Sequence, residues 1–252
     1  IQDAITGNYL LTKSEISRED AVGLLLSIGV EDVSRLPKNK MITGKDVFSA
    51  LLPDDFDFIS YSQDCEKCSK GGKDKCVDDK CIFIKKGYLL SGVINKDYIG
   101  EGSGHILRTL YAQYGPKEAI EILGNISKLG IRYLLNIGFS TGVLDADLDE
   151  SVMTQIKGII DDAEKKVTVL IDDYDNGRLE AFPSKTLKET LELKILEVLN
   201  KTRNKAGDVV IANSEASNPS MIMANSGARG NSMNLAQIAA LVGQQALRGE
   251  RI

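Results

Sequence analysis

Four cysteines lie close together in the first third of the chain, and the remainder of the sequence contains no others. A C-x2-C pair lets two thiolates hold one side of a tetrahedral zinc ion, and a second pair of thiolates closes the site. The spacing here is C-x2-C-x7-C-x4-C. It predicts a structural zinc site whose ligands are Cys65, Cys68, Cys76 and Cys81.

Two other interpretations of these cysteines stay open. The first is an insertion whose thiols are reduced or partly joined in disulfides, and disulfides are an option if the protein comes from a hyperthermophile. A redox function is the weaker alternative, because a reactive C-x2-C pair is expected to begin a helix beside a strand, and the residues around Cys65 lack that context. Neighbouring lysines would offset the negative charge of a zinc tetrathiolate: Lys67, Lys70, Lys73, Lys75 and Lys80.

A second candidate site lies near the end of the chain, where Gly227 and Gly230 bracket a short loop with one cation, Arg229. The loop leads directly into a predicted helix, and we expect loop and helix together to span 226–248. Backbone N–H groups at a helix N-terminus, together with an arginine, can bind phosphate. The apolar side of that helix is predicted to consist of Leu235, Ile238, Ala239 and Val242.

The sequence gives little support for catalysis by its own residues. His105 is the single histidine, and no serine or cysteine nucleophile accompanies it in a suitable setting, so a structural role at a helix start is expected. No Asp-x-Asp-x-Asp run appears that could hold catalytic metal ions. The carboxylates at 172–175 are predicted to form a solvated bend.

The first half of the chain is predicted to mix short helices and strands. Ser17 and Thr43 each precede an apolar run in the pattern of a helix N-cap. Segments 56–61 and 82–94 are rich in β-branched and aromatic residues, which indicates strands. The cysteine-rich loop 64–81 lies between them and is therefore expected at the end of a hairpin. Residues 105–137 return to helix, with a new first turn at Pro116.

The second half is predicted to be mostly helical. Apolar residues recur at three- and four-residue spacing from 150 to 171, and again after a capping box at Thr186. We expect an antiparallel helical hairpin over about 150–203. The glycine-punctuated turn at 138–145 marks the predicted domain boundary. The fold class expected is α+β.

Composition narrows the functional classes. The net charge is −5, which argues against the whole chain acting as a nucleic-acid clamp. No apolar run approaches the length of a membrane span, and the first residues given lack the charged and apolar regions of a signal peptide. No membrane partner and a cytoplasmic location are therefore expected. The chain begins without Met and ends within ordered-looking sequence, so we expect a piece of a longer protein.

Four segments, in order, resemble one family. They are QDAITGNYLLT (2–12), LSGVINKDYIG (90–100), GFSTGVLD (138–145) and SGARGNSMNLAQIAALVGQQALRGERI (226–252). Each is similar to an element of the largest subunit of multisubunit RNA polymerases, and the last resembles the stretch before the bridge helix. Arg229 and the Gly-Gln-Gln sequence favour an archaeal chain. The cysteine cluster has no counterpart in the family's common pattern.

The resemblance implies a small mixed α/β pore domain with short antiparallel strands at about 1–140, and a mostly helical funnel domain at about 141–252. Together these would line the secondary channel, where nucleoside triphosphates enter and the RNA 3′ end is extruded. Arg229 would contact the incoming triphosphate. Further residues would support the loop and the bridge helix: Gly227, Gly230, Asn231, Gln244 and Gln245.

The same resemblance implies partner molecules and a segment without catalytic activity of its own. The Mg²⁺-binding aspartates would lie outside these residues, so no catalytic residue is expected here. The partners would be the other polymerase subunits, a transcript-cleavage factor docked on the helical hairpin, and DNA through the whole complex. The competing hypothesis is a stand-alone zinc-bearing interaction module whose helical hairpin recruits proteins.

Overall fold

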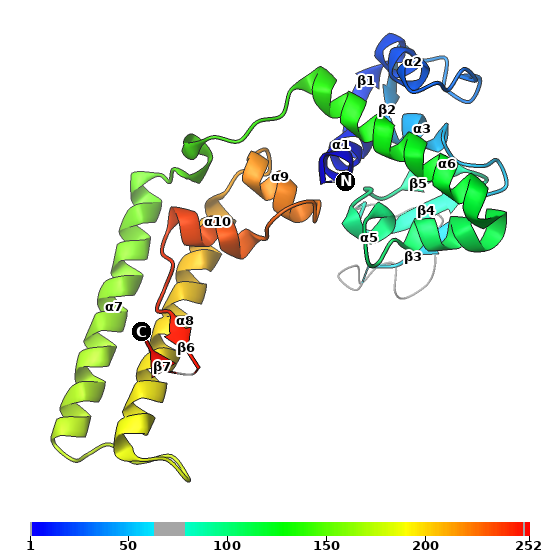
Figure 1. The fold of residues 1–252 in the computed structure, drawn as a ribbon. Coiled ribbons are helices and arrows are strands. Elements are labelled where there is room, and N and C mark those ends of the chain that lie inside the picture. Colours follow the sequence, from blue (N-terminus) through cyan, green and yellow to red (C-terminus); the bar gives the residue numbers. More distant parts are fainter. Residues whose placement is uncertain (1, 63–78, 249) are drawn as a thin grey trace. The chain divides into compact units, whose positions relative to one another are not determined.

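The computed structural model describes every residue except 1, 63–78 and 249. The chain forms two compact units (Figure 1). The first consists of Ile1–Ser140 together with Ile222–Gly230, and the second of Thr141–Met221 together with Asn231–Ile252. Short antiparallel strands accompany the helices, which confirms the α+β class.

Two crossing helices, α1 (Gln2–Lys13) and α6 (His105–Ile137), form the centre of the first unit. They approach so closely at Gly7 and Gly130 that a Cβ on Gly7 would lie 1.9 Å from the carbonyl oxygen of Gly130. Only glycine permits such backbone contact. Beside the crossing, the buried Asn8 amide donates hydrogen bonds from α1 to the Ile126 carbonyl of α6 at 2.9 Å and to a carbonyl of its own helix.

Two short strands directly precede the next two helices. β1 (Glu15–Ser17) pairs antiparallel with β2 (Met41–Thr43), and each strand leads into a helix, α2 (Arg18–Ser27) or α3 (Gly44–Ser49). The hydroxyls of the last strand residues accept hydrogen bonds from the first-turn N–H groups of these helices. Both predicted N-caps are therefore confirmed, and the caps satisfy donors that a helix start otherwise leaves unpaired.

A three-stranded antiparallel sheet packs on the same core, in the order β3 (Phe58–Ser60), β4 (Ile82–Lys85), β5 (Tyr88–Ser91). The cysteine-rich loop joins β3 to β4, as predicted. β4 turns into β5 through two residues with positive φ, Lys86 and Gly87. Such a pair is the turn that matches the twist of a two-residue hairpin.

α5 (Lys96–Ile99) precedes α6, which is broken at Gly115. Gly115 has φ 80°, outside the helical region, and Pro116 begins the second half of α6. The predicted restart of the helix at Pro116 is confirmed. Its cause is the fixed φ of proline, which suits a first helical turn.

The second unit is built on a long helical hairpin. α7 (Glu150–Asp175) and α8 (Leu187–Asn213) lie side by side, and the 3-10 turn η1 (Val143–Ala146) precedes them (Figure 1). The start of α7 packs with the end of α8, and the end of α7 packs with the start of α8. This exchange of ends is the pattern of an antiparallel pair. Thr186 caps α8 with a full capping box, as predicted.

Two boundaries of the hairpin helices differ from the sequence prediction. The carboxylates at 172–175 form the last turn of α7, and the chain reverses only at Asn176 and Gly177, where Gly177 has φ 68°. α8 continues through Asn213 because Ala206 and Val210 are buried against α7 and extend its apolar face. The predicted end of the hairpin near 203 was therefore too early.

The segment 226–248 is not one loop and helix. α9 (Pro219–Asn225) comes first, α10 (Ser232–Ala239) follows the glycine loop, and β6 (Ala246–Leu247) pairs with β7 (Glu250–Arg251). Gly243 has φ 79°, a left-handed conformation that a helix cannot continue through. Within the described residues, no helix is both long and apolar enough to cross a lipid bilayer.

Candidate functional site

The glycine loop that follows α9 packs into the first unit. Ser226 is fully buried, and Ala228 is part of the hydrophobic core of that unit. The N–H of Lys96, at the start of α5, donates to the Ser226 carbonyl at 3.0 Å. The loop is therefore fixed to a rigid element instead of projecting freely.

The loop uses its own N–H groups to hold its shape. The N–H groups of Ser226, Gly227 and Arg229 donate to carbonyls of α9 at 2.9–3.3 Å. The Ala228 N–H lies 3.4 Å from the Ser226 hydroxyl. These four donors are occupied and are not available to an anion, whereas the charged side chain of Arg229 is exposed.

Arg229 is exposed, and within the described residues its side chain makes a single, weak contact. Its Nη1 atom lies 3.4 Å from the Gln2 Oε1 atom of α1. Among the described residues, no carboxylate forms an ion pair with this guanidinium. A guanidinium held at its base and unneutralised at its tip is suited to bind a phosphate or carboxylate with two parallel hydrogen bonds.

Gly227 is required by geometry on two counts. Its φ is 71°, and a Cβ at this position would lie 2.9 Å from the Cβ of Lys96. Gly230 also has a positive φ, 68°. The two glycines allow the chain to enter and leave the loop while Arg229 stays at the surface.

Three of the four segments singled out by sequence come together in the first unit. Gln2 belongs to the first segment, Lys96 to the second and Arg229 to the last. A further contact links the first two segments, because the Thr12 hydroxyl accepts the Ile94 N–H at 3.1 Å. The glycine turn at 138–145 lies apart from these contacts, and its Asp145 side chain accepts the Gly142 N–H within the turn.

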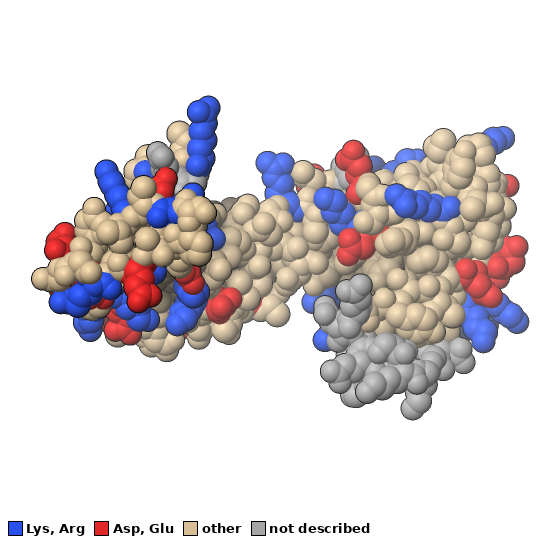
Figure 2. Space-filling model, turned by 90° about the horizontal axis from the view of Figure 1, so that it is seen from below, with Lys and Arg blue, Asp and Glu red and all other residues tan. Residues whose placement is uncertain are grey.

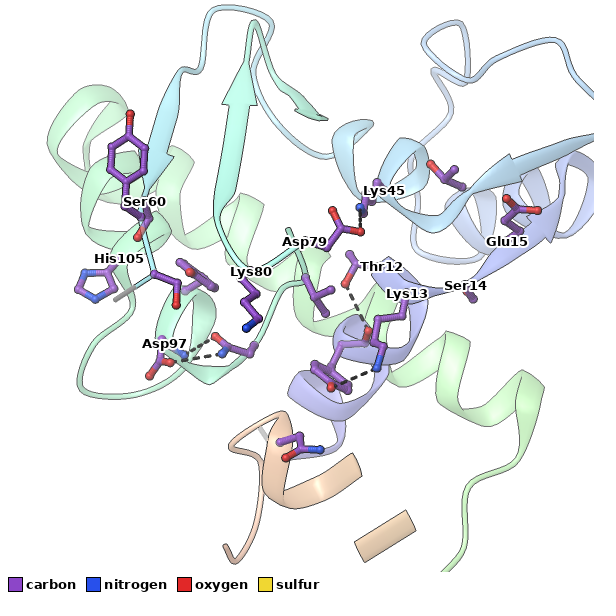
Figure 3. Close-up of a pocket in the computed structure, with 18 residues that line it drawn as sticks. Thr12, Lys13, Ser14, Glu15, Lys45, Ser60, Asp79, Lys80, Asp97 and His105 are labelled. Atoms are coloured by element: carbon purple, nitrogen blue, oxygen red, sulfur yellow. Dashed lines mark hydrogen bonds and ion pairs between the residues drawn. The ribbon is translucent and has the colours of Figure 1, made fainter. Parts of the chain in front are cut away.

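A pocket of about 1070 Å³ opens in the first unit between the end of α1, the strands β1 and β2, and the ends of the three-stranded sheet (Figure 3). Its charges are balanced and partly paired, since Lys45 Nζ lies 2.6 Å from Asp79 Oδ2. Burial raises the pKa of Tyr98, which keeps its phenol neutral. The lining includes three lysines and three acids: Lys13, Lys45, Lys80, Glu15, Asp79 and Asp97.

His105 also lines this pocket and is the first residue of α6. The predicted position at a helix start is confirmed. Its ring lies 6.5 Å from the ring of Tyr98.

Figure 2 shows basic and acidic side chains interspersed over the face that it presents, without a continuous basic band. As far as the described residues go, the pocket and this face therefore lack the dense positive charge of a nucleic-acid clamp.

Comparison with known proteins identifies the family. The family model "RNA polymerase Rpb1, domain 3" matches residues 1–146, and "RNA polymerase Rpb1, domain 4" matches residues 171–252. The chain belongs to the family of RNA polymerase largest subunits. This membership supports the resemblance drawn from the four segments and decides against a stand-alone interaction module.

Archaeal relatives align with this polymerase segment over its entire length. The DNA-directed RNA polymerase subunit Rpo1N of Methanocaldococcus jannaschii is 37% identical to it, and 19% of that relative is covered. The corresponding subunits of Methanothermobacter thermautotrophicus and Thermococcus celer are 38% and 36% identical, with 29% and 30% covered. The polymerase segment therefore spans between about a fifth and a third of these relatives.

The residues predicted to support the loop and the bridge helix do not all lie in the same surroundings. Asn231 is the N-cap of α10, and its side chain accepts the Asn234 N–H at 2.9 Å. Gln244 and Gln245 lie beyond the end of that helix, where their amides donate to nearby backbone carbonyls.

The predicted apolar side of the C-terminal helix is only partly correct. Leu235 is buried, whereas Ile238 and Val242 are 75% and 56% exposed. The neighbour that shares the core with Leu235 is Ala236. Ala239 is partly buried against the same cluster, so the buried side of α10 runs through Leu235, Ala236 and Ala239. At 3.6 residues per turn, Ile238 lies outside this side.

Of the predicted zinc ligands, only Cys81 can be described. It is fully buried directly before β4, and its sulfur accepts the Ser62 N–H at 3.4 Å. Cys65, Cys68 and Cys76 lie outside the described residues. In the part of the chain that the structure describes, no group of three or more His, Cys, Asp or Glu residues is placed to hold a metal ion.

Proposed function

We propose that this segment lines the secondary channel of a cytoplasmic DNA-directed RNA polymerase. Nucleoside triphosphates would enter along it, and the RNA 3′ end would be extruded past it during backtracking. The complete enzyme, a nucleotidyltransferase, would hold its Mg²⁺ ions with aspartates outside these residues and contact DNA as a whole complex. Family membership and the exposed cation on the glycine loop support this proposal.

The observation that carries the proposal is the setting of Arg229. The loop is fixed at Ser226 and Lys96, while the guanidinium remains exposed and without an ion-pair partner among the described residues. We assign Arg229 to the triphosphate of the incoming nucleotide, where two N–H groups would bind phosphate oxygens. Gly227, Gly230 and Asn231 would keep the loop in the shape that presents it.

The proposal is tested in the assembled polymerase. Arg229→Ala should raise the apparent KM for nucleoside triphosphates by about tenfold or more, because a charge-assisted hydrogen bond contributes roughly 1.5–3 kcal/mol. Arg229→Lys should recover part of the loss, since lysine keeps the charge but not the paired geometry. The matched control is Arg178→Ala, which removes an arginine paired with Asp173 in the second unit. An unchanged KM and elongation rate for Arg229→Ala would remove the proposed role.

Gln244 and Gln245 are assigned to support of the bridge helix expected to follow this segment. Their amides hold the backbone around Val242 and Gly243 and reach the carbonyl of Ile252. Such contacts would fix the direction in which the chain leaves the second unit.

We assign the helical hairpin as the docking site of a transcript-cleavage factor. The segment would also contact the other polymerase subunits. Its two helices span 26 and 27 residues and carry most of their charged side chains on the exposed side. A rigid, charged surface of this kind suits a reversible partner held partly by electrostatic attraction.

Zinc bound by Cys65, Cys68, Cys76 and Cys81 remains part of the proposal, on the cysteine spacing alone. Four thiolates would cross-link the loop between β3 and β4 near the buried Cys81. Metal analysis of the purified chain should find about one equivalent of zinc, and replacing Cys65 and Cys68 by serine should abolish it. Disulfides found by mass spectrometry in place of zinc would sink this assignment.

A further inference from the structure

A shallow apolar groove of about 410 Å³ runs along one side of the α7–α8 hairpin. Its floor is formed by Val169 and Leu170 of α7 and by Val198 of α8. Lys165 and Lys166 complete the lining, and no carboxylate takes part in it. The groove therefore combines aliphatic surface with positive charge.

The aliphatic floor is open to solvent within the second unit. Val169 is 57% exposed, although valine in a helix of a soluble protein more often faces a core. Lys165 is also free to reorient, because its ion pair with Asp162, at 3.6 Å, joins two side chains that are both more than two-thirds exposed. Exposed pairs of this kind contribute little and break easily.

Two lysines of α8 lie on the same helix face as Val198. Lys194 and Lys201 lie four residues before and three residues after Val198, so all three share one helix face. Lys194 packs over the ring of Phe182 at 5.4 Å, and Lys201 pairs with Glu197 in its own helix. These two lysines thus share a helix face with Val198, whereas the lysines that line the groove itself are Lys165 and Lys166 of α7.

We propose that this groove binds an acidic amphipathic helix of a partner protein, with an aliphatic side chain on Val169 and Val198 and carboxylates beside the lysines. The inference rests on the proposed function of the hairpin as a docking site and specifies the chemistry of the partner. Two packed helices offer a groove of the width that a third helix fills. Opposite charges at its rim set the orientation and speed the encounter.

The composition of the groove favours protein over RNA. Single-stranded nucleic acid is held by aromatic side chains on which bases stack, and the lining contains no aromatic residue. The aliphatic floor is also small, so the interaction should be weak and sensitive to salt.

The experiment measures binding of a synthetic peptide to the assembled polymerase. The probe is a fluorescein-labelled helical peptide with leucines along one face and glutamates beside them, and a peptide of the same composition in scrambled order is the reference. Fluorescence anisotropy should show salt-sensitive binding of the first peptide only. Val169→Glu should weaken binding of the first peptide roughly tenfold. The substitution places a carboxylate where a leucine of the peptide would pack, and this carboxylate has the same charge as the peptide's glutamates.

Two variants sharpen the result. Leu193→Glu is the matched control, since Leu193 is a 38% exposed residue of α8 that does not line the groove, and binding should be unchanged. The pair Lys165→Glu with Lys166→Glu should reject the glutamate peptide and accept one in which lysines replace the glutamates. A charge swap of this kind cannot result from misfolding.

Other outcomes overturn the inference. Equal binding to wild type and Val169→Glu would show that the peptide lies elsewhere, and competition by single-stranded RNA would assign the groove to nucleic acid. Loss of a subunit from the Val169→Glu enzyme would mean that the groove is covered within the polymerase. The proposed docking function is tested separately: a hairpin shortened by removal of 167–199 should lose factor-stimulated transcript cleavage, whatever the peptide does.

Discussion

Tyr114 illustrates how one side chain ties two parts of the first unit together. Its hydroxyl donates a hydrogen bond to Asp55 Oδ1 at 2.7 Å, and its ring contacts that of Phe56. Burial and the neighbouring Asp55 carboxylate raise the pKa of Tyr114 to about 12, from an ordinary value of 10.0. The neutral phenol is therefore favoured in the folded state.

The sign of this shift gives a pH prediction. A pKa raised on folding contributes stability that is complete below pH 10 and is lost as the pH rises through about 12. Tyr114→Phe should lower the free energy of unfolding by about 0.5–1.5 kcal/mol at neutral pH and flatten this alkaline decline. Urea unfolding followed by circular dichroism at several pH values measures both effects. An identical alkaline decline in the variant would contradict the assignment.

Gly227 offers a prediction on the loop itself. Gly227→Ala places a side chain at φ 71° and against Lys96, and should destabilise the loop by about 1–2 kcal/mol. Hydrogen exchange at residues 222–230 should become faster. The control is Gly158→Ala in α7, where a Cβ meets nothing within 4 Å and alanine should stabilise the helix by up to about 1 kcal/mol.

At the scale of elements, the sequence was sufficient to predict those features that depend on residues close together in the chain. The caps at Ser17, Thr43 and Thr186 are hydrogen bonds between residues three apart, so sequence alone identified them. The end of α10 was missed. The left-handed Gly243 that follows it packs against the side chain of Arg203, a contact between segments far apart in sequence.

The C-terminal strand pair depends on another distant contact, the ion pair between Arg251 and Glu192 of α8. The guanidinium donates two hydrogen bonds to the carboxylate, at 2.6 and 3.0 Å. This contact lowers the pKa of Glu192 below its ordinary 4.5. A lowered pKa contributes stability that is present above pH 4.5 and is lost as the pH falls further.

Glu192→Gln should therefore release β6 and β7 from α8. Hydrogen exchange across 246–251 should be faster in the variant at neutral pH, and the difference from wild type should disappear in acid. Glu197→Gln is the control, because Glu197 pairs with Lys201 inside α8 and should leave the strands unaffected. Equal exchange in wild type and Glu192→Gln at neutral pH would show that the ion pair does not hold the strands.

For the whole molecule, the feature that sequence reasoning could not supply is the return of 222–230 to the first unit. Hydrophobic periodicity indicates which side of a segment is buried, but not which core receives it. Arg229 was identified from residue type and loop glycines, whereas its neighbours Gln2 and Lys96 come from distant segments. The candidate residue was thus predictable, and its surroundings were not.

The packing of 222–230 in the first unit gives a prediction about stability. Ala228→Asp places a charge in the core of the first unit and should cost about 1–3 kcal/mol there, with little effect on the second unit. Hydrogen exchange resolved by peptide would separate the two units. Ala216→Asp, at an exposed position, is the control. Equal loss of protection in both units would indicate that they unfold as one.

The divided first unit also has a consequence for how the protein is made. A ribosome that has synthesised residue 140 has not yet supplied 222–230, so the core around Ala228 must wait for the whole hairpin to emerge. At about 5–20 residues per second, the delay is on the order of ten seconds. During that interval the nascent first unit exposes apolar surface, and the hairpin, whose contacts are local, can fold before the unit that precedes it.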